Sequence, residues 1–122
     1  MSAVSIRGAI TTKVNTKEAI LEATKLMLEA IIKENELQIE HIVQIHFSAT
    51  KDLDAVYPAV AARNIGITAA SLMCFQEMYV ACSLEKCIRV DMLVEQEGLT
   101  RANVKHQYLR DAKRLRPDLV KE

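Results

Sequence analysis

The sequence predicts an α+β domain in which one long helix covers one face of a β-sheet. Several segments alternate apolar residues with other residues, and this period of two is typical of half-buried strands. Residues 14–36 instead repeat apolar positions every three or four residues, as an amphipathic helix does. The chain has 122 residues, 50% of them hydrophobic, which suits a single domain with one core.

The first predicted strand is AVSIRGAITT, residues 3–12. One face carries Val4, Ile6, Gly8 and Ile10, whereas the other places Arg7 among small residues. The long helix follows, with Asn15 as its N-cap and Glu18 completing a capping box. Its main apolar row is Ile20, Thr24, Met27 and Ile31.

A second strand is predicted over HIVQIHFSAT, residues 41–50. Regular alternation places three apolar residues on one face, namely Val43, Ile45 and Phe47. The other face, which is only half polar, carries Ile42, Gln44 and His46. A loop and a short helix are predicted next, because Pro58 suits a first helical turn and Gly66 suits the position just past a helix end.

Two further strands are predicted in the second half of the chain. Residues 68–81, TAASLMCFQEMYVA, are mostly apolar but are interrupted by Gln76 and Glu77. Residues 86–95, KCIRVDMLVE, have an apolar face made of Ile88, Val90, Met92 and Val94. The opposite face carries Cys87, Arg89, Asp91 and Leu93, and Asp91 is the simplest exposed partner for Arg89. Gly98 is expected to end the regular structure after this strand.

The last segment, VKHQYLRDAKRLRPDL, supports two interpretations. Leu109, Ala112 and Leu115 have helical spacing, so intrinsic propensity favours a helix. A final strand with Tyr108 on one face is the alternative, and Pro117 would end either element.

The overall charge does not point to nucleic acid or to a membrane, because 16 basic residues balance 16 acidic ones. The segment 101–122 is locally cationic but lacks the interleaved aromatic residues of an RNA-binding surface. No apolar run is long enough to span a bilayer, and the first residues do not resemble a signal peptide, so we expect a cytoplasmic protein. The three cysteines, which lack metal-type spacing, are expected to be free thiols.

The motifs of several enzyme classes are missing from the sequence. There is no Gly-rich phosphate loop, no HExxH and no cluster of metal ligands, and the three histidines are scattered. A metalloenzyme or a hydrolase with a covalent nucleophile is therefore poorly supported. The candidate site residues that remain are charged. The acidic one is Glu77, and the guanidinium groups suited to binding carboxylates or phosphates are Arg7, Arg63, Arg89 and Arg116. From pattern alone, a solvated or ion-paired surface residue is the commoner interpretation of each arginine, because most charged residues lie at the surface.

Four motifs resemble the AroH class of chorismate mutases, which are trimers of the pseudo-α/β-barrel type. They are IRGAITT, SATKDLDAVYPAVAAR, CFQEMYV followed by KCIRV, and YLRDAKRLRPDL. The resemblance implies one domain over residues 1–122, with a mixed sheet of about five strands, a strand in the last segment and a mobile tail from about residue 116. It also implies a homotrimer whose sheets pack around a threefold axis, with the active sites between subunits.

The reaction implied by this resemblance is the rearrangement of chorismate to prephenate in phenylalanine and tyrosine biosynthesis. This [3,3]-sigmatropic reaction needs no nucleophile, metal or cofactor, so positioning and electrostatic stabilisation would supply the catalysis. The alternative is a trimer of the same fold that binds a small dicarboxylate without converting it.

The resemblance also assigns roles to individual residues. Arg89 would donate to the ether oxygen of chorismate and, together with Arg7, bind its side-chain carboxylate. Glu77 would accept a hydrogen bond from the ring hydroxyl, and Tyr108 would contact a carboxylate. The remaining expected substrate-binding residues are Met73, Cys74, Phe75, Gln76, Tyr57, Arg63, Leu115 and Arg116. The chain departs from the family pattern at Val60, where a lysine is common, and at Met73, which replaces a small polar residue.

Overall fold

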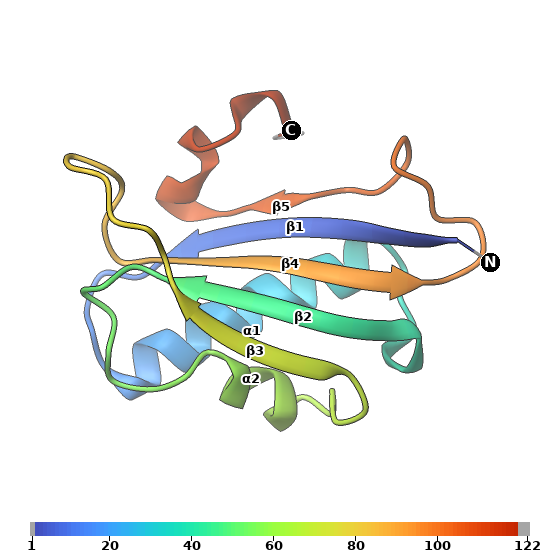
Figure 1. Ribbon diagram of the computed structural model, residues 1–122, viewed down its shortest axis with the longest axis horizontal. Coiled ribbons are helices and arrows are strands. Elements are labelled where there is room, and N and C mark those ends of the chain that lie inside the picture. Colours follow the sequence, from blue (N-terminus) through green and yellow to red (C-terminus); the bar gives the residue numbers. More distant parts are fainter. Residues whose placement is uncertain (1, 120–122) are drawn as a thin grey trace.

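Five strands form one mixed sheet with both α-helices on the same face (Figure 1). The computed structural model describes residues 2–119. The strands are β1 (Ala3–Thr11), β2 (Ile42–Ala49), β3 (Ser71–Gln76), β4 (Cys87–Glu95) and β5 (Gln107–Tyr108). Their order across the sheet is β3-β2-β4-β1-β5. The pairs β1–β4 and β2–β4 are antiparallel, whereas β1–β5 and β2–β3 are parallel. The predicted mixed α+β sheet is therefore confirmed.

The long helix α1 (Lys17–Glu34) and the short helix α2 (Ala59–Asn64) cover the inner face of the sheet. The core lies between these helices and the alternate strand residues that point toward them. Its fully buried members include Ile6, Ile10, Ile20, Met27, Ile31, Ile45, Phe47, Ile88 and Met92. Because apolar burial contributes roughly 25 cal/mol per Å², this single layer supplies most of the stabilisation and fixes which strand face is outward.

The start of α1 differs from the prediction by one residue. The N-cap is Thr16, whose hydroxyl oxygen accepts a hydrogen bond from the Ala19 backbone N–H at 3.1 Å. Asn15 instead ties the helix entry to the loop that follows β2, because its side-chain amide donates to Asp54 at 2.7 Å. Both residues are good cap formers, so sequence preference alone does not choose between them.

A β-bulge in β2 overturns the predicted face of Val43. The register with β4 shifts between Ile42 and Gln44, so Val43 is an extra residue that has no partner in this ladder. Ile42 is consequently buried, whereas Val43 is 38% exposed. Beyond the bulge the alternation resumes, and Ile45 and Phe47 point into the core as predicted.

The C-terminal segment packs against the face of the sheet that is opposite the helices. The last segment contains the strand β5, as the family resemblance implied, although this strand has only two residues. Two 3₁₀ helices follow, η2 (Arg110–Arg114) and η3 (Pro117–Leu119), so Pro117 begins an element instead of ending one. A further 3₁₀ turn, η1 (Ile39–His41), precedes β2. The expected mobile tail falls on η3 and, in part, outside the described residues.

The third predicted strand is shorter than expected, since β3 stops at Gln76. Residues 77–86 then leave the sheet as a loop that crosses to β4 (Figure 1). This early end places Glu77 just beyond the strand, next to the outer face of the sheet. Within residues 2–119, no helix is long and apolar enough to cross a membrane.

Candidate active site

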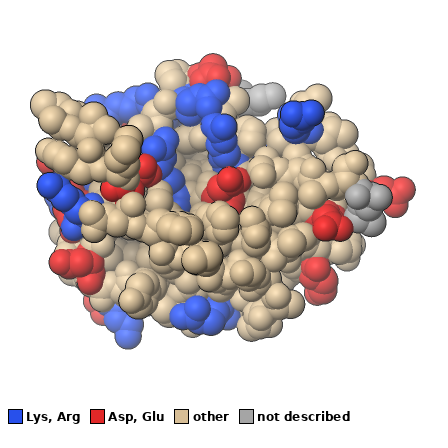
Figure 2. Space-filling model, in the orientation of Figure 1, with Lys and Arg blue, Asp and Glu red and all other residues tan. Residues whose placement is uncertain are grey.

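A cavity of about 360 Å³ lies on the outer face of the sheet, opposite the helices. Figure 2 shows this face, where basic and acidic side chains surround a hollow. Every strand contributes to the cavity wall. Its lining residues are Arg7, Gly8, His46, Phe47, Ser48, Phe75, Glu77, Arg89, Val90, Asp91 and Tyr108.

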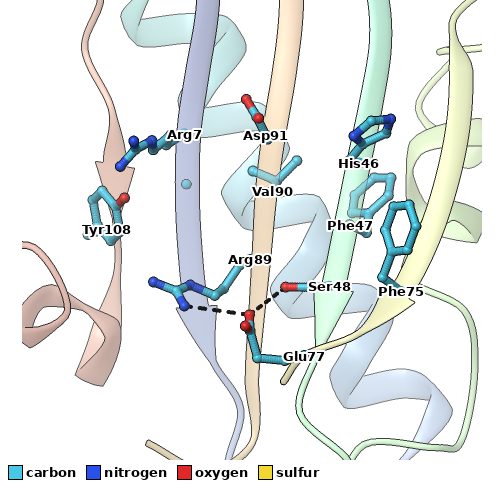
Figure 3. A pocket seen from close by; sticks show the side chains of 11 residues that line it. Arg7, His46, Phe47, Ser48, Phe75, Glu77, Arg89, Val90, Asp91 and Tyr108 are labelled. Carbon is cyan, nitrogen blue, oxygen red and sulfur yellow. Dashed lines mark hydrogen bonds and ion pairs between the residues drawn. The ribbon is translucent and has the colours of Figure 1, made fainter. Parts of the chain in front are cut away.

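The two strand-centre arginines lie in this cavity because they occupy outward positions on adjacent strands. Arg7 is on β1 and Arg89 is on β4, two residues apart along the antiparallel ladder, since Ala9 pairs with Arg89. Figure 3 shows both guanidinium groups extending toward the same side of the site as Tyr108. The backbone N–H of Arg7 donates to Nδ1 of His106 at 2.8 Å, which helps to join β1 to the start of β5.

Glu77 forms the opposite wall of the cavity and is held by three contacts. Its backbone N–H donates to the carbonyl of Ala49 at 2.9 Å. Its Oε1 accepts a hydrogen bond from the Ser48 hydroxyl at 2.7 Å and lies 3.5 Å from Nη1 of Arg89. The partner of Arg89 is therefore Glu77, and not Asp91, the simplest exposed partner that the sequence offered.

Asp91 lies in the middle of a row of polar residues across three strands. The register pairs Asp91 with Arg7 on β1 and with His46 on β2. Figure 3 shows its carboxylate between these two side chains. The His46 ring also meets Phe75 edge to face, with 5.5 Å between ring centroids. A carboxylate thus stands beside one of the two cationic groups that are suited to binding an anion.

Tyr108 is fixed by a small second apolar cluster beneath the C-terminal segment. This cluster contains Ala9, Cys87, Tyr108 and Ala112, with Leu84, Leu115 and Leu119 packed against it. Burial raises the pKa of the Cys87 thiol to about 11, although the nearby Arg89 charge acts in the opposite direction. Cys87 therefore remains a neutral thiol near pH 7 and serves as a packing residue.

Several predicted substrate-binding residues do not lie in this cavity. Tyr57, Cys74 and Gln76 line a separate cavity of about 580 Å³ beyond the end of β2, and Phe75 touches both cavities. Cys74 points toward the helices and packs against the core, as the strand parity relative to Glu77 indicated. Met73 shares the outer face with Phe75, whereas Arg63 is exposed at the end of α2.

The two remaining predicted residues lie in the C-terminal segment. Leu115 supports the cluster around Tyr108. Arg116 makes a bidentate ion pair with Asp118, with an Nη2–Oδ2 distance of 2.8 Å, and this pair lowers the pKa of the Asp118 carboxyl. Arg116 also lines a neighbouring cavity of about 480 Å³ together with Arg7 and His106. Within one chain, the cavity of about 360 Å³ on the outer face therefore brings together Arg7, Phe75, Glu77, Arg89 and Tyr108.

A family model described as chorismate mutase type I matches residues 3–119. The chain belongs to this family. It is 47% identical over 115 residues to the chorismate mutase AroH of Bacillus subtilis, covering 93% of this chain and 90% of that protein. It is 42% identical over 115 residues to the chorismate mutase AroH of Thermus thermophilus, covering 93% of each chain. A solved chorismate mutase from Clostridium thermocellum superposes with a TM-score of 0.88 and 45% identity, covering 90% of this chain and 97% of that chain.

Three polar cavity residues of this chorismate mutase were not predicted as site residues: His46, Ser48 and Asp91. All three occupy the same strand faces as the residues that were predicted, so strand parity alone could have flagged them. Their contribution was hidden because the partner of Ser48 comes from the segment after β3, and the neighbours of Asp91 come from β1 and β2. Among residues 2–119, the structure shows no group of three or more metal-ligating side chains.

Proposed function

We propose that the chain catalyses the rearrangement of chorismate to prephenate in this cavity, by positioning and electrostatic stabilisation. The observation that carries the proposal is that two guanidinium groups and the Glu77 carboxylate face a shared cavity in a chain of the chorismate mutase family. The reaction is intramolecular, so a site that only binds and polarises the substrate can accelerate it. The expected contribution is greatest where charge develops in the transition state.

Each group has a role that matches its position. Arg89, at the centre of the cavity, donates to the ether oxygen as its bond to the ring breaks and negative charge grows there. Arg7, on the neighbouring strand, binds the side-chain carboxylate, and its planar fork suits a bidentate contact. Glu77 faces them and accepts a hydrogen bond from the ring hydroxyl. Tyr108, on the edge strand β5, donates a hydrogen bond from its phenolic O–H to a carboxylate of the substrate.

We further propose that the chain is a homotrimer in which a neighbouring subunit completes the site. Large apolar side chains are exposed along β3 and the loop after it, including Met73, Phe75, Met78, Tyr79 and Val80. Such a patch is typical of an interface between subunits. Because Tyr57 and Arg63 do not line the outer-face cavity of their own subunit, they would approach the substrate from the adjacent subunit. The three free cysteines fit a cytoplasmic location.

The first test is to incubate the purified protein with chorismate and to follow its loss spectroscopically, with prephenate identified as the product. We expect turnover without any added metal or cofactor. A folded trimer that binds chorismate in calorimetry but does not convert it would leave the non-catalytic dicarboxylate binder as the function. If the folded protein neither bound nor converted chorismate, the proposed site itself would be overturned.

The oligomeric state has its own matched test. Sedimentation equilibrium should give three times the chain mass of 13.7 kDa. Val80→Glu places a charge in the exposed apolar patch and should reduce both the mass and the turnover. Leu26→Glu is the control, because Leu26 is a similarly exposed apolar residue on the helix side and should retain both. A wild-type monomer with full turnover would contradict the trimer.

A further inference from the structure

Ser48 lines the cavity from the outward face of β2, and its hydroxyl contacts Glu77. The register places it directly opposite Arg89 on β4 and beside Phe75 on β3. Its side chain is half-buried and points outward with His46, away from the core. The hydroxyl donates to Oε1 of Glu77 at 2.7 Å, so the hydrogen bond bridges β2 and the segment that follows β3 (Figure 3).

Glu77 depends on such a contact because it lies beyond the last residue of β3. The backbone bond to Ala49 fixes its main chain but not its side-chain torsions. The other described contact of its carboxylate is with Arg89, at 3.5 Å. Charge-assisted hydrogen bonds are usually about 2.7–2.9 Å long, so the Ser48 contact is the shorter and the more restrictive of the two.

Both side-chain contacts use the same oxygen, Oε1. In the described part of the chain, Oε2 accepts no hydrogen bond and remains available to a ligand. The bond from Ser48 also keeps the carboxylate from turning fully toward Arg89. A close bidentate pair between Glu77 and Arg89 would occupy the guanidinium fork that the substrate needs.

We propose that Ser48 is a positioning residue for the reaction: its hydroxyl holds Oε1 of Glu77 so that Oε2 faces the ring hydroxyl of the substrate and Arg89 stays free. This inference rests on the proposed function, since it assigns Glu77 and Arg89 their roles there. Ser48 itself does not touch the reacting atoms. It acts through the orientation of Glu77, and its loss is felt only while Glu77 is present.

The test is a double-mutant cycle on the full-length chain, with kcat and KM measured on chorismate. Ser48→Ala should lower kcat/KM about tenfold, the scale of one hydrogen bond to a charged group. Ser48→Thr keeps the hydroxyl and should restore most of the activity. In a Glu77→Ala background, adding Ser48→Ala should change kcat/KM less than about twofold, because the group to be positioned is gone.

The controls separate positioning from folding. Ser71→Ala removes a hydroxyl from β3, outside the cavity, and should leave both kinetic constants unchanged. Ser48→Cys keeps the side-chain size with a weak donor and should resemble Ser48→Ala in activity while melting at the wild-type temperature. An equal loss from Ser48→Ala with and without Glu77, or no loss at all, would overturn the positioning role. Inactivity of the wild-type chain on chorismate would instead refute the proposed function.

Discussion

Replacing Arg89 by alanine separates its role in the reaction from its role in the fold. The side chain is 40% exposed and makes one described ion pair, with Glu77 at 3.5 Å. An ion pair of this exposure contributes at most about 1 kcal/mol to folding, so the variant should remain folded. The core face of β4 is untouched, because Ile88 and Val90 point the other way.

The loss of activity should be much larger than the loss of stability. A donor aimed at developing negative charge contributes about 10²–10³ in kcat, or roughly 2.7–4 kcal/mol. We expect Arg89→Ala to lose at least that much. Arg89→Lys should recover only part of it, because lysine keeps the charge but not the planar fork that can serve the ether oxygen and a carboxylate together.

Steady-state kinetics on chorismate, combined with thermal unfolding, would check this prediction. The expected result is a fall in kcat with a melting temperature within a few degrees of the wild type. A near-normal kcat in a folded Arg89→Ala protein would refute the transition-state role. A change confined to KM would reduce Arg89 to a substrate-binding residue.

Three further changes test other parts of the structure. Asp91→Asn removes a carboxylate from beside Arg7, and with it a charge that repels an anionic substrate. KM for chorismate should fall a few-fold, and the fall should be larger at low salt than at high salt. An increase in KM would mean that Asp91 orients Arg7. Burial raises the pKa of Cys87 from 9.0 to about 11, so its contribution to stability is complete below pH 9 and is lost as the pH rises to 11. Denaturant unfolding should show that the free energy of unfolding falls by about 2–3 kcal/mol over this pH range. The fall should be smaller in Cys87→Ala. Gly8→Ala would place a methyl 2.9 Å from the Ile31 side chain and should destabilise the fold by about 1–3 kcal/mol, measured as a lower melting temperature.

The elements that could be predicted from the sequence are those governed by local periodicity. The apolar faces of β1 and β4 and the span of α1 follow directly from spacings of two and of three to four residues. The bulge at Val43 could not be predicted, because it depends on how β2 is registered against β4. Local propensity did not settle the last segment either, since β5 is stabilised by pairing with β1 and not by its own sequence.

The family resemblance named some residues that line the cavity and others, such as Tyr57 and Gln76, that do not, and it did not name Ser48 or Asp91. Arg7, Glu77, Arg89 and Tyr108 do meet in one cavity. The pairing of Arg89 with Glu77 could not be derived from the sequence, because β3 ends earlier than its apolar run suggests and Glu77 turns back toward Ser48. Periodicity assigns a face to each residue, but it does not give the distance between two residues on different strands.

The position of β1 in the sheet has a consequence for how the chain is synthesised. Its two hydrogen-bonded neighbours are β4 and β5, which lie within residues 87–108. During synthesis, β1 therefore stays without a strand partner until β4 and β5 have been made. An apolar alternating strand in that state is prone to aggregate with other nascent chains. The charge of Arg7 at the centre of β1 opposes such pairing, so the guanidinium proposed to bind the substrate would also disfavour aggregation of the unfinished chain.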